Sequence, residues 1–122
     1  MANSTFHRVQ SKVRELKILT AKVSIGASGA PTLTSSDGVA SIVRDSAGVY
    51  IVTLDEKFNE LHGFHPMLLE ATAEDLTFQV ESEDVDGAKT IQFQCKAADV
   101  ETDPSDGSAL LLTILVKNSG IK

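Results

Sequence analysis

Three histidines and a single cysteine are the side chains of this chain that are best suited to bind zinc. His62 and His65 lie three residues apart, and Cys95 or His7 could complete a set of four ligands. Zinc sites are usually built from paired short spacings of Cys and His, whereas here one loose pair is followed by Pro66. The spacing therefore favours no metal site.

The acidic run from Ser82 to Gly87 resembles the start of a calcium-binding loop, in which alternate acidic residues precede a glycine. The frame of such a loop fails, since Ser82 would be the first ligand and Phe93 would stand where a bidentate glutamate is needed. A solvated hairpin turn fits the pattern better. A surface cation shared with Asp103 or Asp106 is the alternative.

Motifs of catalytic sites are missing from the sequence. It contains no Gly-x-Ser-x-Gly, no phosphate-binding loop before a helix and no His-Glu-x-x-His. Glu56 and Glu60 are spaced as on the surface of a helix, and the glycine-rich piece from Gly26 to Gly29 leads into Pro31 and a strand-like segment. We predict no enzymatic activity and no cofactor.

Cys95 is predicted to be a buried thiol. It lies on the same side of an alternating run as Ile91 and Phe93, which places it among core residues. A single cysteine cannot form a disulfide within the chain. Since the sequence also lacks a membrane span and the apolar core of a signal peptide, we expect a protein made and kept in a cytosol-like compartment.

Most of the chain is predicted to form β-strands. Apolar and polar residues alternate with period two over 76–81, 90–96 and 110–117. A long first strand is predicted from Val9 to Ile25, with a helix over Val9–Leu19 as the competing interpretation. Its inward side would carry Leu19, Ala21, Val23 and Ile25.

The segment from Gly38 to Leu54 is predicted to be the central hairpin. Asp45 to Gly48 would form a four-residue loop of turn-forming residues. This loop sets the register Val43–Tyr50, Ser41–Val52 and Val39–Leu54 on one face and Ile42–Ile51 on the other. Both faces then carry apolar pairs, so both need cover from a second sheet, a loop or another subunit.

Residues 56–70 are predicted to form one short helix or an irregular loop, because Gly63 and Pro66 would stop a helix that begins near Glu56. This part is rich in apolar residues and would cover one face of the hairpin. The apolar residues are Phe58, Leu61, Phe64, Met67, Leu68 and Leu69.

The length of 122 residues predicts one domain and one core, with 42% hydrophobic and 23% charged residues. We assign residues 1–16 to an N-terminal arm and 17–122 to a single domain. About six short strands without a long helix favour an antiparallel β-sandwich or small barrel of the jelly-roll kind. We take an all-β, jelly-roll-like sandwich as the prediction. No segment approaches the roughly 20 apolar residues of a membrane span.

Charge is unevenly distributed along the chain. Residues 1–36 have a net charge of +4 and residues 37–122 a net charge of −10, which together give the −6 of the whole chain. A solvated basic strand is one interpretation, and a basic arm that binds an acidic surface of its own or a neighbouring subunit is the other. Nucleic-acid binding is disfavoured, because the acidic body repels phosphates. The candidate contact residues of the arm are Arg8, Lys12, Arg14 and Lys17.

Several segments together resemble the small structural proteins of tailed-phage virions. They are Gly26–Leu33, Gly38–Arg44, Ala47–Leu54, Leu110–Lys117 and the following Asn118-Ser119. The match covers most of residues 19–118. Within that group, the size and the absence of a fibrous repeat point to the capsid decoration, or cement, proteins.

The resemblance implies a structural function and no catalytic one. Such proteins clamp neighbouring major capsid proteins from the outside, so the expected partners are the major capsid protein and further copies of this chain as a dimer or trimer. The expected location is the virion exterior after synthesis in the host cytoplasm. A receptor- or carbohydrate-binding β-module at a tail tip is the alternative, and a small hydrolase with an unrecognised site is the weakest one.

Four apolar residues on the predicted outer sides of strands are the remaining candidates for contact with a partner. If the chain leaves them exposed, they would bind another subunit, whereas a monomer would need them buried. They are Val49, Ile51, Leu111 and Leu115.

Overall fold

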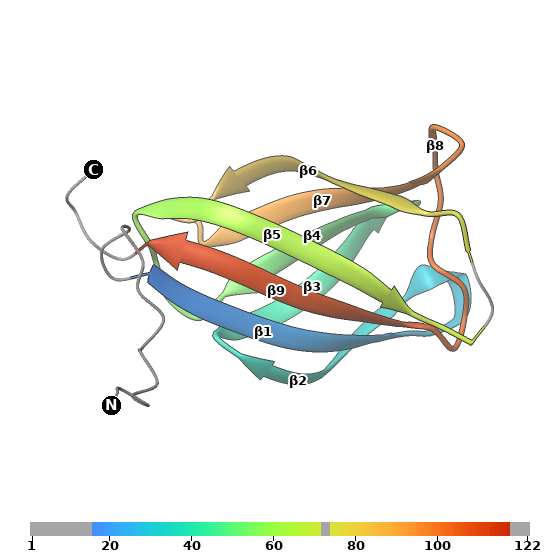
Figure 1. Cartoon of the computed structure of the whole chain (residues 1–122), viewed down its shortest axis with the longest axis horizontal. Coiled ribbons are helices and arrows are strands. Elements are labelled where there is room, and N and C mark those ends of the chain that lie inside the picture. The colour runs from blue at the N-terminus through green and yellow to red at the C-terminus, as the bar shows by residue number, and fades with distance from the viewer. Residues whose placement is uncertain (1–15, 72–73, 118–122) are drawn as a thin grey trace, which may run out of the picture.

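The computed structural model describes residues 16–71 and 74–117, which fold into two antiparallel sheets packed face to face (Figure 1). The front sheet has the strand order β2-β1-β9-β5, and the back sheet has the order β3-β4-β7-β6, with β8 paired to β7. The strands are β1 Leu16–Ile25, β2 Pro31–Asp37, β3 Val39–Ser46, β4 Val49–Leu54, β5 Glu60–Leu69, β6 Thr77–Asp84, β7 Thr90–Ala97, β8 Val100–Glu101 and β9 Ala109–Lys117.

The predicted all-β sandwich is confirmed. Four pairs of neighbours in the chain, β1–β2, β3–β4, β6–β7 and β7–β8, are antiparallel and lie in one sheet. The other connections cross between the two sheets and join the layers. A single 3-10 turn, η1 Ala27–Gly29, lies between β1 and β2. Residues 9–15 of the predicted first strand and most of the predicted arm lie outside the described residues.

The core lies between the sheets and is built from the inward side of each strand. The predicted inward residues of β1 are buried, and those of β7 and β9 are at most 2% exposed. Tyr50 and Phe93 stack with ring centroids 5.6 Å apart, and Phe64 of the front sheet packs on Phe93 at 5.0 Å. The fully buried inward residues of β7 and β9 include Ile91, Phe93, Cys95, Leu110, Ile114 and Val116.

The prediction of a helix or loop over residues 56–70 is wrong for most of its length, because residues 60–69 form the ten-residue strand β5. A bulge between Leu61 and Gly63 shifts the register, so that Leu61 and Phe64 both pack against the core although they are three residues apart. That spacing imitates a helix. Pro66 is tolerated because β5 is an edge strand.

The predicted hairpin exists, but its loop and most of its register are wrong. The strands β3 and β4 are joined by the two residues Ala47 and Gly48, and of the predicted pairs only Val39–Leu54 occurs. Bulges near each end of β3 shift the pairing between them by one residue, so that Val43 faces Ile51.

Candidate functional site

The outer face of the front sheet is the candidate functional site. Its side chains alternate along β1, β9 and β5 with those that fill the core, and strand pairing sets them in five rows across the sheet. Four rows, each in the order β1, β9, β5, are Ile18, Leu115 and Gly63; Thr20, Thr113 and His65; Lys22, Leu111 and Met67; and Ser24, Ala109 and Leu69. The fifth row, at the start of β1, is Leu16, Lys117 and Glu60.

Large apolar side chains are exposed on this face. Ile18 is 62% exposed, Met67 66% and Leu69 50%, while Leu111 and Leu115 between them are half-buried. In the described part of the chain only Val43 and Val100 are further large hydrophobic residues of comparable exposure, and both belong to the back sheet. Three of these five exposed residues therefore lie on the front sheet, where half-buried Leu111 and Leu115 lie between them.

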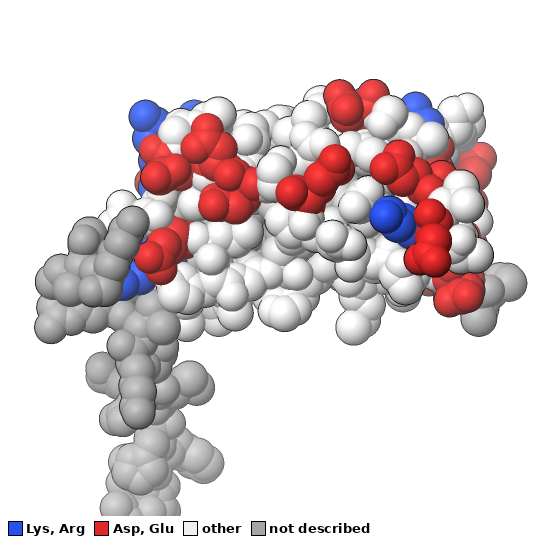
Figure 2. All heavy atoms as spheres, turned by 90° about the horizontal axis from the view of Figure 1, so that it is seen from above, with Lys and Arg blue, Asp and Glu red and all other residues white. Residues whose placement is uncertain are grey.

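Charge is sparse around these apolar side chains. In the four rows from Ile18 to Ser24 only Lys22 carries a full charge, with His65 as the one further titratable side chain. The fifth row adds Glu60 and the buried Lys117 at one end, and Asp37 lies beside Thr20 on β2. Figure 2 looks down on the side of the molecule where β5 and β6 lie in Figure 1 and shows a row of acidic side chains along it. The lower margin of this view, on the side of the front sheet, is without charge over most of its length. Depletion of charge around exposed apolar side chains is typical of protein interfaces.

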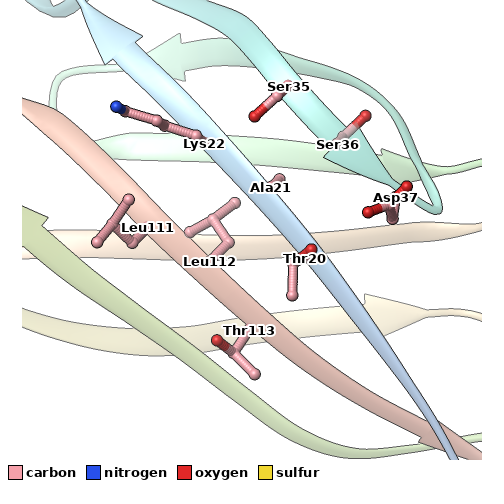
Figure 3. A pocket seen from close by; sticks show the side chains of 9 residues that line it. All are labelled: Thr20, Ala21, Lys22, Ser35, Ser36, Asp37, Leu111, Leu112 and Thr113. Atoms are coloured by element: carbon pink, nitrogen blue, oxygen red, sulfur yellow. The ribbon is translucent and has the colours of Figure 1, made fainter.

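Two shallow grooves run along the outer face and share Lys22. The first has a volume of about 440 Å³ and lies over β2, β1 and β9, where its lining includes Ser36, Asp37 and Leu111 (Figure 3). The second, of about 660 Å³, lies at the other end of the sheet beside Leu69.

The first groove offers hydroxyls and one carboxylate but no activated nucleophile in its lining. The hydroxyl of Ser36 donates a hydrogen bond of 2.8 Å to the carbonyl of Val39, and the acidic side chain of Asp37 is exposed. No histidine lines either groove. Its polar groups are thus suited to hydrogen-bond a ligand rather than to transform one.

A second group of polar side chains lies at the Ala47–Gly48 end of the β3–β4 hairpin. Arg44 donates two hydrogen bonds to Asp103, from Nε to Oδ1 at 2.9 Å and from Nη2 to Oδ2 at 2.8 Å. The amide of Gly48 donates to the same Oδ1 at 2.8 Å. The hydroxyl of Tyr50 donates to the carbonyl of Gly29 at 2.8 Å and lies 3.3 Å from Asp103 Oδ1. This Asp103 cluster joins β3, β4, the η1 turn and the loop after β8.

The electrostatics of the Asp103 cluster favour a structural role. Burial opposes ionisation of Asp103, but the hydrogen bonds from Arg44 and Gly48 outweigh it and hold the pKa of this carboxyl below its usual value. Burial, with the charge of Asp103 as the next cause, raises the pKa of the Tyr50 phenol. Each group is held in its ordinary charge state at neutral pH, so none is prepared for proton transfer.

Metal binding finds no support in the described ranges 16–71 and 74–117, which contain no group of three or more metal-binding side chains. His62 Nε2 lies 2.9 Å from Glu60 Oε1 at the surface, whereas Cys95 is buried in the back sheet. Burial, followed by the charge of Asp103, raises the pKa of this thiol to about 12, and the predicted buried cysteine is confirmed.

The acidic turn after β6 is a hairpin turn, as predicted. The carboxylate of Asp84 accepts a hydrogen bond of 2.9 Å from the amide of Ala88, and Val85 between them is buried. The turn thus uses its own carboxylate to stabilise its backbone.

The predicted contact residues do not form one surface. Arg8, Lys12 and Arg14 lie outside the described residues, and Lys17 is exposed near the start of β1. Leu111 and Leu115 lie on the outer face of the front sheet. Ile51 is half-buried on the opposite face of the molecule and pairs with Val43, and Val49 is buried at 4% exposure.

Sequence reasoning found only part of the candidate site. It identified Leu111 and Leu115, but it missed Met67 and Leu69 as surface residues because it assigned them to a loop that covers the core. It also missed Ile18. Alternation starting from the predicted inward residue Leu19 was the signal that could have placed Ile18 outside.

Comparison with protein-family models, with curated proteins and with solved structures finds no match to this chain. None of the helices in the described part is long and apolar enough to cross a membrane. The fold and the site define an antiparallel β-sandwich whose front sheet exposes large apolar side chains with few charges among them.

Proposed function

We propose that this chain is a structural virion protein that decorates a phage capsid by bridging neighbouring major capsid proteins. In this proposal the outer face of the front sheet is the surface that docks on the capsid. The observation that supports it most is the group of exposed apolar side chains on that face, Ile18, Met67 and Leu69.

The energetics of burying this face suit a structural protein. Full burial of one large apolar side chain contributes about 1.5–3 kcal/mol, and three such side chains are at least half exposed here. A contact that buries them stabilises the assembly by mass action and needs no chemistry. The sandwich supplies a firm support, since the opposite side of the same strands packs in the core.

The resemblance of the sequence to tailed-phage structural proteins favours a capsid as the partner. A capsid presents many copies of one subunit side by side, so a small protein that contacts two of them gains from multivalency. Self-association as a dimer or trimer belongs to the same proposal.

A receptor- or carbohydrate-binding module at a tail tip is the second candidate function. The groove of about 440 Å³ favours it, because Ser35, Asp37 and Thr113 offer hydroxyls and a carboxylate that can hydrogen-bond a sugar (Figure 3). The groove has no aromatic side chain in its lining, although aromatic rings are the usual platform for sugar stacking. The capsid therefore stands first.

Substitutions on the face test the proposal. Met67→Asp combined with Leu69→Asp should reduce binding to purified capsids at least about tenfold, since both charges would lose water at the interface. The matched control is Val100→Asp, which changes an equally exposed hydrophobic residue outside this face (65% against 66% for Met67) and should leave binding unchanged.

Co-sedimentation with capsids measures the binding, and thermal unfolding checks that all variants remain folded. Unchanged capsid binding by the folded double variant would contradict the assigned face. Retention of the wild-type protein on a glycan column, with no binding to capsids, would favour the second candidate.

A further inference from the structure

We infer that this chain forms a two-fold symmetric dimer in which the free edge of β3 pairs antiparallel with β3 of a second copy. This dimer gives a surface to the self-association that belongs to the proposed function, and it rests on that function in this respect alone, since it needs no capsid. Three properties of β3 support it: an unpaired backbone, few charges and an exposed apolar side chain.

The backbone of β3 is unpaired on one side. Within residues 16–71 and 74–117, β3 Val39–Ser46 pairs with β4 and with no other strand. Six of its eight residues are exposed. Edge strands present a row of free backbone N–H and C=O groups that can pair with another extended segment. The edge of β3 is therefore open to a further strand.

The sandwich has two open sides, and the side of β5 and β6 is protected against a second copy. The edges of β5 and β6 lie next to each other, opposite those of β2 and β3 (Figure 1). In β5 the edge is interrupted by Pro66 and by a bulge. In β6 it carries the exposed Glu81, Glu83 and Asp84, on the side where Figure 2 shows the acidic row. Two copies would repel each other there.

On the other side of the sandwich, β3 gains more from a further strand than β2 does. The edge strand β2 begins with Pro31, and its exposed side chains are hydroxyls and the carboxylate of Asp37. In β3, Val43 is 52% exposed and lies beside the half-buried Ile51 on the outer side of the sheet. A strand beside β3 would thus remove an apolar side chain from water, and this favours association.

The bulges of β3 limit the register. They lie near its two ends and leave Ser41–Arg44 as the regular part of the strand. In an antiparallel pair about a two-fold axis, the same residues of both copies make the contact. We place Val43 on the axis, so that it faces the second copy's Val43. Ile42 then faces the second copy's Arg44, and Asp45 lies beside the second copy's Ser41.

The charges of β3 are compatible with pairing to a second copy. Arg44 is held on its own chain by Asp103, through hydrogen bonds of 2.9 and 2.8 Å. The other charged residue of the strand, Asp45, lies about 13 Å along the strand direction from the second copy's Asp45 in this register, at about 3.3 Å per residue. No like charges therefore face each other, in contrast to the edge of β6.

The contact is small, which predicts a weak dimer. The eight residues of β3 compare with roughly 20–30 residues a side in a standard protein interface. Sedimentation velocity of the full chain should show monomers at about 1 μM and dimers at about 1 mM, as expected for a dissociation constant between these concentrations.

Charges placed on the axis test the contact. Val43→Lys and Val43→Glu should each raise the dissociation constant of the dimer at least about tenfold, because like charges then meet on the axis and lose water. An equimolar mixture of the two variants should dimerise again, since lysine then faces glutamate. The matched control is Val100→Lys, which changes another exposed valine of the back sheet (65%) and should leave dimerisation unchanged. Thermal unfolding checks that all variants remain folded.

A cysteine on the axis tests the register. In Val43→Cys the Cα atoms of the two cysteines would be about 4.5–5.5 Å apart, within the range of a disulfide. Mild oxidation should cross-link this variant at least about tenfold faster than Ser41→Cys, whose cysteines would be about 13 Å apart in the paired strands. The native Cys95 is buried and present in both variants.

Four results would overturn the proposal. They are a wild-type chain that stays monomeric at about 1 mM, a dimer that Val43→Lys leaves unchanged, equally fast cross-linking of Val43→Cys and Ser41→Cys, and loss of the dimer in the folded variant Met67→Asp with Leu69→Asp. The last result would assign self-association to the front sheet. Capsid binding is read from the front-face variants and dimerisation from the Val43 variants, so failure of one is distinguishable from failure of the other.

Discussion

Asp103 accepts hydrogen bonds from Arg44 and Gly48, which lie more than fifty residues away in the sequence. Its carboxylate lies between the end of the β3–β4 hairpin and the loop that leads to β9. Two parallel hydrogen bonds between a guanidinium and a carboxylate fix geometry as well as charge. At the scale of single residues, Asp103 is the side chain that joins separate parts of the fold.

Asp103→Asn should lower the free energy of unfolding by about 1–3 kcal/mol at neutral pH, since it breaks the ion pair with Arg44 and weakens the bond from Gly48. The partly exposed side chains, 32% for Arg44 and 21% for Asp103, keep the loss moderate. Urea denaturation of the wild-type chain and the variant measures this loss of unfolding free energy. The exposed neighbour Asp106→Asn serves as the control and should change stability by less than about 0.5 kcal/mol.

The same variant should change the response to acid. The pKa of Asp103 is lowered in the folded chain, so its contribution is complete above the unfolded value of about 3.9 and is lost as the pH falls through the folded value. The stability difference between the wild-type chain and Asp103→Asn should therefore shrink below about pH 4. A difference that stays constant from pH 7 to pH 3 would contradict the assigned ionisation.

The sequence contains no sign of the Asp103 cluster. Asp103 stands in a stretch of turn-forming residues, where solvation is the ordinary expectation for an acidic side chain. Its partners are set by the way the loop after β8 returns over the hairpin, and this depends on the packing of the whole sandwich. A pattern with a period of two or 3.6 residues cannot carry such information.

At the scale of the elements, the strands that alternate clearly were predictable, and those interrupted by bulges were not. The buried sides of β1, β7 and β9 follow directly from their alternation. In β5 the bulge at His62 breaks the pattern, and in β3 two bulges shift the hairpin register by one residue. Bulges are set by twist and by contacts with the facing sheet, so a local pattern hides them.

The tight connection at the end of the β3–β4 hairpin yields a prediction at this scale. Gly48 has a φ of +71°, and a Cβ there would come within 2.6 Å of both the Cys95 carbonyl oxygen and the Thr102 amide nitrogen. Gly48→Ala should therefore cost more than about 2 kcal/mol of stability, through backbone strain and displacement of both neighbours.

Gly107→Ala is the matched control for that substitution. Its φ is +89°, but a Cβ there would meet nothing within 4 Å, so only the backbone cost of about 1 kcal/mol is expected. Thermal unfolding compares the two variants. Equal destabilisation would show that the close approach of Cys95 and Thr102 to the turn contributes nothing.

At the scale of the whole molecule, the two outer faces of the sandwich differ. The front sheet exposes Ile18, Met67 and Leu69 with little charge around them. The back sheet exposes Val43 and Val100, and on its outer side Gln92 donates a hydrogen bond to Glu81, and Gln94 takes the position opposite Val49.

The proposed function requires that the outer face of the front sheet docks on a capsid. If a phage encodes this chain, as the proposal requires, electron cryomicroscopy of its intact particles would show where the sandwich lies. The proposed function predicts density for the sandwich on the outside of the head, bridging neighbouring capsid subunits, with Ile18, Met67 and Leu69 buried in the contact. Particles whose heads lack this density, or that hold the sandwich by its back sheet with the front face open to solvent, would contradict it.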